Sequence, residues 1–188
     1  MFSSSERSTG LSKYMLCALF TAFIAIGGFI KVYFYTVPVT LQTFFISCCA
    51  LLLGKRLGSF SVLLYIFMGL VGIPVFTEGG GIFYVLKPSF GYIIGFFFGA
   101  YVTGLVSEKL GERNIKNFFI ASAVGLAVIY ACGMLYYYFL SNFYLKNYVG
   151  FWKMLVYFCF IFVPGDLAGC LAAAYVSDRI YPRLGNKI

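Results

Sequence analysis

The stretch FFIASAVGLAVIYACGMLYYYFL at residues 118–140 decides the fold class, because it holds no charged residue over a length that crosses a membrane. A helix needs about 20 mainly apolar residues to span the hydrocarbon core. The backbone must satisfy its own hydrogen bonds there, so spanning segments are helices or closed barrels. Further apolar runs lie at residues 14–33, 41–53, 59–73, 90–106 and 155–175. The sequence therefore predicts an all-α integral membrane protein with six transmembrane helices.

The composition agrees with this class. Hydrophobic residues make up 62% of the chain and charged residues 11%, against about 45–50% apolar and about 25% charged in soluble domains. The second and third runs are short, so we expect them to extend, tilt or lie partly re-entrant. No linker or repeat divides the chain. We expect one membrane domain over residues 1–188, with residues 1–13 as a polar cytoplasmic start.

The distribution of positive charge predicts the orientation. Six spans would place both termini and the loops after the second and fourth helices on one side of the membrane. Of the 14 Lys and Arg, ten fall on that side: Arg7, Lys13, Lys55, Arg56, Lys109, Arg113, Lys116, Arg179, Arg183 and Lys187. The other side holds Lys31, Lys87, Lys146 and Lys153. Positive residues are enriched in cytoplasmic loops, so both termini are predicted to be cytoplasmic.

Several functional classes are disfavoured. The chain has no histidine, and its six cysteines lie in apolar runs without C-x-x-C spacing. The commonest zinc ligand and general base are therefore missing, and we expect neither a metal site nor an enzyme. The segment Gly54-Lys55-Arg56 lacks the spacing and hydroxyl of a phosphate-binding loop. Any ATP is expected to be used by a partner.

Small residues mark one face of the first predicted helix. Ala18 and Ala22 lie one turn apart, a spacing that lets another helix approach closely. That helix can belong to this chain or to a partner. Between the first two runs, VPVTLQT at residues 37–43 carries polar Thr40, Gln42 and Thr43 near the outer boundary. Their side chains can cap a helix or face a ligand.

The segment GIPVFTEGGGIFYVLKPSFGY at residues 72–92 is unusually apolar for a connector. The glycines Gly79, Gly80 and Gly81 allow positive φ and close backbone approach. The segment also supplies flat aromatic surfaces and one cation, Lys87. It suits a loop folded over a small organic anion. The alternative is an interfacial loop whose aromatic rings and Lys87 lie at the headgroup level.

Asp166 stands in FVPGD at residues 162–166, inside an otherwise apolar run. Ionisable groups at such depth face a partner, a cavity or a ligand, because burying an unpaired charge is costly. Asp166 is therefore a candidate functional residue. A structural pair with Lys87 or Lys153 is the alternative.

Four motifs in this order resemble the BioY family: VPVTLQTF at 37–44, GIPVF at 72–76, GGG with KPSFGY at 79–92, and VPGDL at 163–167. The resemblance spans residues 14–178. It implies a six-helix S component of an energy-coupling factor (ECF) transporter, which captures biotin at the outer face of the bacterial plasma membrane. It also implies a transmembrane coupling subunit and two cytoplasmic ATPases as partners. Ala18 and Ala22 match the family's docking motif for the coupling subunit.

Biotin offers a carboxylate, a ureido ring and an apolar bicycle, and each part needs a complement. Within this resemblance Lys87 is expected to pair with the valeryl carboxylate and Asp166 to accept from the ureido N–H groups. Gln42 or Thr43 would complete the polar set. The bicycle would lie among aromatic rings, Phe76, Tyr84 and Tyr92. The opposite orientation of biotin is the alternative.

One position departs from the family pattern. Many members continue the last motif as P-G-D-x-x-K, whereas this chain has Gly169. The missing cation shifts the expected charge contact onto Lys87. Three other functions stay open at this point: an S component for another small vitamin, an intramembrane enzyme using Asp166 with Glu78, and a structural membrane protein without a ligand.

Overall fold

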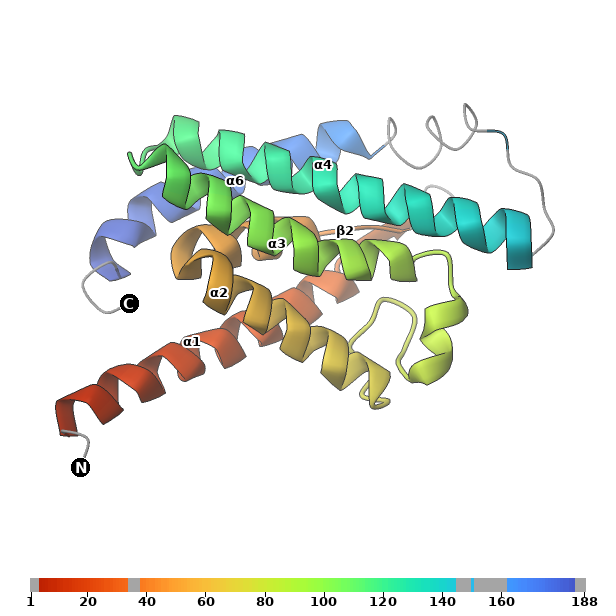
Figure 1. Cartoon of the computed structure of the whole chain (residues 1–188), viewed down its shortest axis with the longest axis horizontal. Coiled ribbons are helices and arrows are strands. Elements are labelled where there is room, and N and C mark those ends of the chain that lie inside the picture. The colour runs from red at the N-terminus through yellow and green to blue at the C-terminus, as the bar shows by residue number, and fades with distance from the viewer. Residues whose placement is uncertain (1–3, 34–37, 145–149, 151–161, 185–188) are drawn as a thin grey trace.

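The computed structural model describes residues 4–33, 38–144, 150 and 162–184. Helices dominate these residues (Figure 1): α1 (Ser4–Phe29), α2 (Gln42–Leu70), α3 (Phe90–Leu110), α4 (Ile115–Phe139) and α6 (Val163–Leu184). A small antiparallel hairpin joins α1 to α2, with β1 (Lys31–Tyr33) paired to β2 (Pro38–Thr40). A 3-10 helix η1 (Ile82–Leu86) precedes α3, and a π-helical turn η2 (Leu140–Tyr144) follows α4.

Within the described residues, four segments are long and apolar enough to cross a membrane: Leu11–Phe29, Gln42–Leu70, Phe90–Leu110 and Ile115–Asn142. An all-helical membrane architecture is thus confirmed at this level, with the short hairpin as a local exception. Helix α1 starts at Ser4, so it includes most of the predicted polar start. The last predicted helix, 155–175, coincides with α6 from residue 163 onward. Residues 155–161, Lys146 and Lys153 lie outside the described residues.

Helix α2 is two helices joined at a sharp break. Gly54 has φ +76° and ψ 179°, which lies in a region that favours glycine. A Cβ atom at Gly58 would lie 2.9 Å from the Ala50 Cα, although residues eight apart in a continuous helix are about 12 Å apart. The chain therefore reverses at Gly54. The first arm (42–53) and the second arm (55–70) overlap the second and third predicted helices, residues 41–53 and 59–73.

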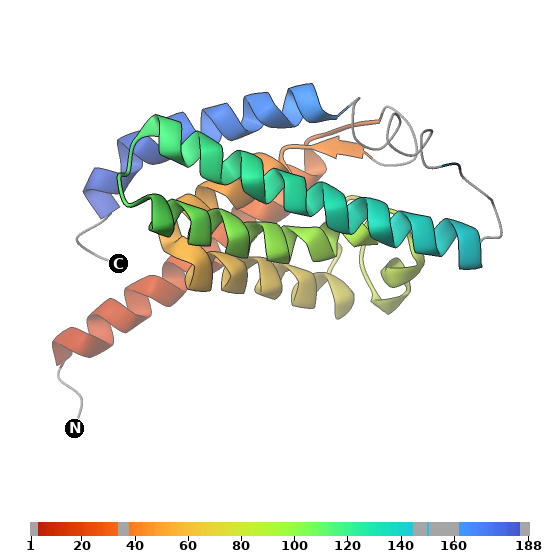
Figure 2. The same cartoon turned by 45° about the horizontal axis from the view of Figure 1, so that its top comes forward.

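The first arm lies in the centre of the bundle. Every residue from 46 to 53 is buried, as expected for a helix that is apolar all round. Helix α2 packs against α1, α3 and α6, and α3 packs against α4. In Figure 2, α3, α4 and α6 run side by side while the N-terminal part of α1 projects away. The first arm is about 18 Å long, shorter than the hydrocarbon core of about 30 Å. Such a short helix is possible because protein, and not lipid, surrounds it.

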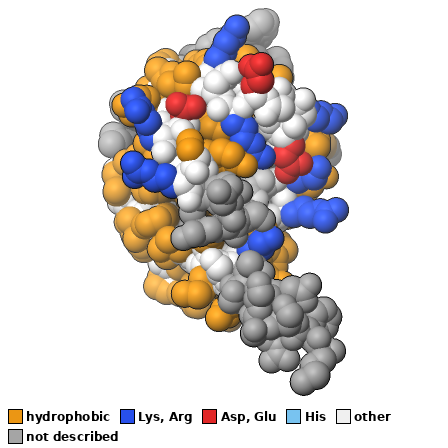
Figure 3. Space-filling view, turned by 90° about the vertical axis from the view of Figure 1, so that its left-hand side faces the viewer, with side chains coloured by type: hydrophobic (Ala, Val, Ile, Leu, Met, Phe, Trp, Pro, Cys, Tyr) orange, Lys and Arg blue, Asp and Glu red, His pale blue; other side chains and the backbone are white. Residues whose placement is uncertain are grey.

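The molecule has two chemically different ends. One end of the bundle, at the left in Figure 1, holds the start of α1, the turn of α2, the α3–α4 connection and the end of α6. We call it the basic end. Lys and Arg side chains gather there (Figure 3). The described cations in these segments are Lys13, Lys55, Arg56, Lys109, Arg113, Lys116, Arg179 and Arg183. The loop end holds the hairpin and residues 71–89, which include Lys31 and Lys87.

Candidate ligand-binding site

A cavity of about 60 Å³ lies at the loop end. Its polar lining comes from Thr40, Gln42, Thr43, Thr77, Ser89 and Asp166. Its apolar and aromatic lining comes from Tyr92, Ile93, Phe96, Ile129, Tyr130 and Phe162. Among the described lining residues Asp166 is the only charged one. No group of three or more His, Cys, Asp or Glu that could hold a metal ion occurs in the described part of the chain.

Asp166 is the polar centre of this cavity. The Thr43 hydroxyl donates to Asp166 Oδ1 at 2.7 Å, and the Tyr130 hydroxyl donates to Asp166 Oδ2. Asp166 lies in the first turn of α6, where the partial positive charge of a helix N-terminus favours an anion. Each carboxylate oxygen can accept more than one hydrogen bond. The site can therefore receive additional N–H donors from a ligand.

Gln42 is fixed in place by the protein. Its side-chain amide nitrogen donates to the Tyr65 hydroxyl at 2.7 Å and to the Ile24 carbonyl at 3.4 Å. Its carbonyl oxygen accepts from the Thr40 hydroxyl at 3.1 Å. Both amide hydrogens are thus used, whereas the oxygen retains a lone pair. Gln42 can accept a hydrogen bond from a ligand, but it has no remaining donor.

The aromatic wall forms where α3 packs on α4. Tyr92 and Tyr130 meet edge to face, with ring centroids 6.1 Å apart. Gly133 allows this arrangement, because a Cβ atom there would lie 2.5 Å from the Tyr92 ring. Phe96 and Ile129 continue the wall. The result is an aromatic surface beside the hydroxyls, which suits a ring system with polar edges.

A second aromatic layer supports the cavity from behind. Phe76 and Tyr84 are buried, with ring centroids 4.6 Å apart, and Phe76 also meets Tyr65 at 5.4 Å. The hydroxyls of Tyr84 and Thr77 are 2.9 Å apart. Thr77 lines the cavity, so the layer holds one wall in position.

The three consecutive glycines shape their own loop. Gly79 and Gly81 have φ of +109° and +106°, and a Cβ atom at Gly80 would lie 2.4 Å from the Ile73 carbonyl oxygen. The Gly81 N–H donates to the Gly69 carbonyl at 2.7 Å, which ties the loop to the end of α2. Among the described residues these glycines are not part of the cavity lining.

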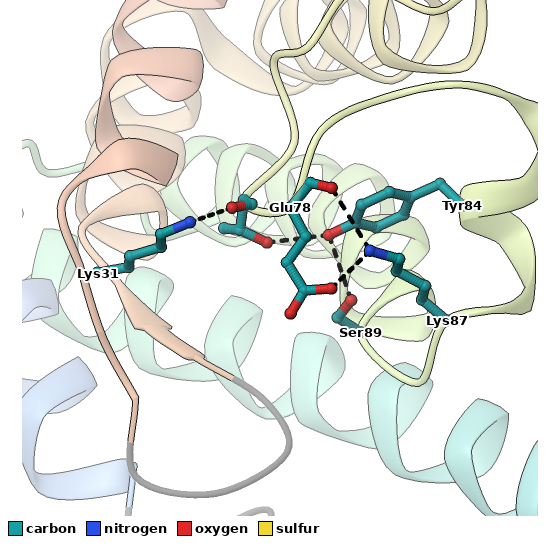
Figure 4. Close-up of polar contacts among 6 residues, drawn as sticks. Lys31, Glu78, Tyr84, Lys87 and Ser89 are labelled. Carbon is teal, nitrogen blue, oxygen red and sulfur yellow. Dashed lines mark hydrogen bonds and ion pairs between the residues drawn. The ribbon is translucent and has the colours of Figure 1, made fainter.

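The cations of the loop end bind to the loop itself (Figure 4). Lys87 Nζ lies 2.7 Å from Glu78 Oε2 and 4.9 Å from the centroid of the Tyr84 ring. The Lys31 ammonium donates to the Thr77 carbonyl. Lys87 is two residues from Ser89, a lining residue, and its side chain is partly exposed. It therefore lies beside the cavity, paired with Glu78 instead of Asp166.

The structure brings only some of the predicted residues together. Gln42, Thr43, Tyr92 and Asp166 line one cavity. Phe76 and Tyr84 lie one layer behind it, and Lys87 and the glycines lie on the neighbouring loop. The alternative was a pair of Asp166 with Lys87 or Lys153. Lys87 is paired with Glu78 and Asp166 with two hydroxyls, so the first of these pairs is not formed, whereas Lys153 lies outside the described residues.

Sequence reasoning missed several lining residues. Tyr130 lay unnoticed in the apolar run 118–140, and only the packing of α4 against α6 brings it to Asp166. Thr77 and Ser89 stood inside the quoted 72–92 segment as polar residues among aromatic ones, so a signal for them existed. Ile93, Phe96 and Ile129 carried no signal beyond hydrophobicity.

The face with small residues on α1 remains open. Ala18 and Ala22 are exposed and border an apolar groove between α1 and the second arm of α2. The groove is also lined by Ala25, Leu64, Tyr65, Met68 and Val75. Packing within the described chain therefore does not cover this face.

Comparisons with known proteins agree over nearly the whole length. The sequence matches the BioY family over residues 3–186. It is 40% identical over 177 residues to a probable biotin transporter BioY of Lysinibacillus sphaericus, covering 94% of this chain and 89% of that protein. It is 36% identical over 164 residues to the biotin transporter BioY of Thermotoga maritima, covering 86% and 91%.

The fold has a counterpart in a crystal structure of the S-component for biotin from an ECF-type ABC transporter. The two structures superpose with a TM-score of 0.79 at 28% sequence identity. The likeness covers 96% of this chain and 94% of that one.

Proposed function

The chain belongs to the BioY family, and from that membership we propose that it is the biotin-capturing S component of an ECF transporter. It takes part in uptake and carries out no chemical conversion. The observation that carries the proposal is the cavity around Asp166, where a carboxylate held by two hydroxyls faces an aromatic wall. Biotin combines N–H donors with an apolar bicycle, and this cavity offers a complement to both.

The ureido ring is the part of biotin that fits Asp166. Its two N–H groups donate to the free lone pairs of the carboxylate, and Gln42 adds an acceptor oxygen. The Thr43 hydroxyl donates to Asp166, so Thr43 orients the carboxylate. The bicycle lies against Tyr92, with Phe76 and Tyr84 supporting the wall from behind. The reversed pose would place the ligand carboxylate beside Asp166, where like charges repel.

With the ureido ring at Asp166, the carboxylate of biotin then points toward Lys87. Lys87 is the proposed partner of this carboxylate. It would break its ion pair with Glu78 and form one with the ligand. A cavity of about 60 Å³ has room for a few water molecules only, so biotin must widen it. The loop with Gly79, Gly80 and Gly81 is the proposed moving part.

We propose six transmembrane helices with both termini cytoplasmic, in one domain over residues 1–188 in a bacterial plasma membrane. The two arms of α2 support the separate second and third helices. The cations gathered at the basic end support this orientation, because positive residues favour the cytoplasmic side. The cavity then faces the outer surface, where a captured vitamin would enter.

The proposed partners are a transmembrane coupling subunit and two cytoplasmic ATPases, which would use the ATP. The exposed Ala18 and Ala22 beside an apolar groove support docking of the coupling subunit, because small residues let helices approach closely. Replacing both alanines with leucine is expected to block assembly and leave biotin binding intact. Co-purification with the coupling subunit, beside a biotin-binding assay, measures both effects.

Competition binding tests the substrate. Purified protein in detergent is loaded with labelled biotin and then titrated with unlabelled biotin, riboflavin, thiamine or niacin. Only biotin is expected to displace the label in the concentration range of its own affinity. Equal displacement by another vitamin would assign the cavity to that vitamin instead.

A further inference from the structure

A second hollow lies at the basic end, between the start of α1, the turn of α2 and the end of α3. It is a groove of about 480 Å³ lined by Lys13, Leu53, Lys55, Arg56, Leu57 and Glu108. Gln42 and Gly54 mark opposite ends of the first arm, which places the groove about 18 Å from the cavity around Asp166. The groove is therefore separate from the proposed biotin site.

The groove has an excess of positive charge. Lys55 Nζ lies 2.8 Å from Glu108 Oε2, and the backbone N–H of Lys55 donates to Glu108 Oε1 at 3.1 Å. Glu108 thus compensates one of three cations. Among the described side chains, neither Lys13 nor Arg56 has an ion-pair partner. The groove can accept an anion between these two side chains.

Two arginines at this end already contact aromatic rings. The Arg113 guanidinium lies 3.9 Å from the centroid of the Tyr181 ring, and the Arg179 guanidinium lies 5.5 Å from that of Tyr175. Such stacking satisfies a cation without a counter-ion. A concave surface with two uncompensated cations therefore distinguishes the groove from these arginines.

The helices beside the groove present an apolar surface. Tyr14 of α1 and Phe60 of the second arm are exposed and meet edge to face, with centroids 6.4 Å apart. Exposed apolar side chains continue along the same two helices: Met15, Leu63 and Phe67. In a membrane this surface faces acyl chains, so the cations lie at the level of the headgroups. An anion with attached hydrocarbon fits both parts.

We propose that this groove binds the phosphate of an anionic phospholipid, with its acyl chains against the exposed apolar side chains beside it, Tyr14, Met15 and Phe60. Arg56 offers a planar fork that matches phosphate oxygens, and Lys13 adds a point charge. Basic pockets between transmembrane helices bind acidic headgroups in this manner. The lipid would brace the start of α1 against the turn at Gly54.

Lipid binding to the delipidated, purified full-length chain tests the proposal. Native mass spectrometry would compare phosphatidylglycerol, phosphatidylcholine and the water-soluble headgroup glycerophosphoglycerol. Phosphatidylglycerol is expected to bind at least about tenfold more tightly than either of the others. Equal binding of phosphatidylcholine would overturn the anionic site. Equal binding of the soluble headgroup would overturn the lipid as its occupant.

Paired charge variants locate the site. The double variant Lys13→Gln/Arg56→Gln is expected to lose at least about tenfold in phosphatidylglycerol affinity and to keep wild-type biotin binding. The control Lys109→Gln/Lys116→Gln removes the same charge from exposed residues outside the groove, and it should retain most of the lipid affinity. Equal losses in the two variants would overturn the groove as the site. If the groove variant does not fold, the comparison of the three ligands on the wild-type protein still tests the proposal.

Discussion

The two ends of the bundle handle charge in opposite ways. At the loop end one carboxylate, Asp166, is buried and held by the hydroxyls of Thr43 and Tyr130. At the basic end an open groove carries three cations, and Glu108 compensates only Lys55. The hollows differ in size as well, at about 60 Å³ and about 480 Å³. A buried charge is tolerated where fixed donors surround it, whereas exposed cations remain available to a partner.

The substitution Asp166→Asn is expected to have the largest effect, because it removes the buried charge of the loop end. It replaces a charged acceptor with an amide and removes charge-assisted hydrogen bonds, each about 1.5–3 kcal/mol. Biotin affinity is expected to fall about 100-fold, as measured by equilibrium binding. Asp178→Asn on the same helix is the matched control and should bind biotin like the wild type. Similar affinities for the two variants would remove Asp166 from the site.

At the basic end, close backbone packing sets the geometry of the groove. A Cβ atom at Gly104 would lie 2.4 Å from the Lys55 nitrogen and 2.5 Å from its Cα. Gly104→Ala is therefore expected to lower the free energy of unfolding by about 2 kcal/mol. Thermal unfolding in detergent measures this loss. Gly165→Ala is the control, because a Cβ atom there has no neighbour within 4 Å. An unchanged melting temperature for Gly104→Ala would show that α3 and the α2 turn can separate freely.

The hydroxyl of Tyr130 tests how Asp166 is held. Tyr130→Phe leaves the aromatic wall and removes one donor to the carboxylate. Biotin affinity is expected to fall about tenfold, since loss of a hydrogen bond to a charged group costs about 1.5–3 kcal/mol and water replaces part of it. Tyr138→Phe on the exposed part of α4 serves as the control. Calorimetric titration of both variants decides whether the hydroxyl contributes.

Substitutions in the ion pair of Lys87 and Glu78 are expected to have the smallest effect on biotin affinity. Lys87→Gln should weaken biotin binding about threefold, because partly exposed ion pairs contribute only about 0.2–1 kcal/mol. Glu78→Gln releases Lys87 and should leave the affinity equal or slightly higher. Binding isotherms at low and high salt measure both, since screening diminishes such contacts. If Glu78→Gln weakens binding more than Lys87→Gln does, Lys87 is not the cation for the carboxylate.

The sequence predicted the helices well because charge-free apolar runs of this length have few alternatives. It also separated residues 41–53 from 59–73, and the break at Gly54 lies between them. The complete enclosure of the first arm was not predictable, since it depends on α1, α3 and α6 packing around it. The hairpin of residues 31–40 is too short to produce a pattern.

The residues of the site that could be predicted were those that contrasted with apolar surroundings or lay in the motifs that resemble the BioY family. Asp166 was found because a carboxylate in an apolar run requires an explanation. Tyr130 was not found, since it lies in a helix rich in tyrosine and meets Asp166 only after folding. Two hydroxyls from α2 and α4 hold the carboxylate in this chain, and their partnership leaves no trace in local sequence.

A binding isotherm of labelled biotin on the purified wild-type protein in detergent tests the central claim most directly. We predict saturable binding at one site per chain with a dissociation constant well below the micromolar range. Absence of saturable binding tighter than micromolar would contradict the assignment of this cavity to biotin.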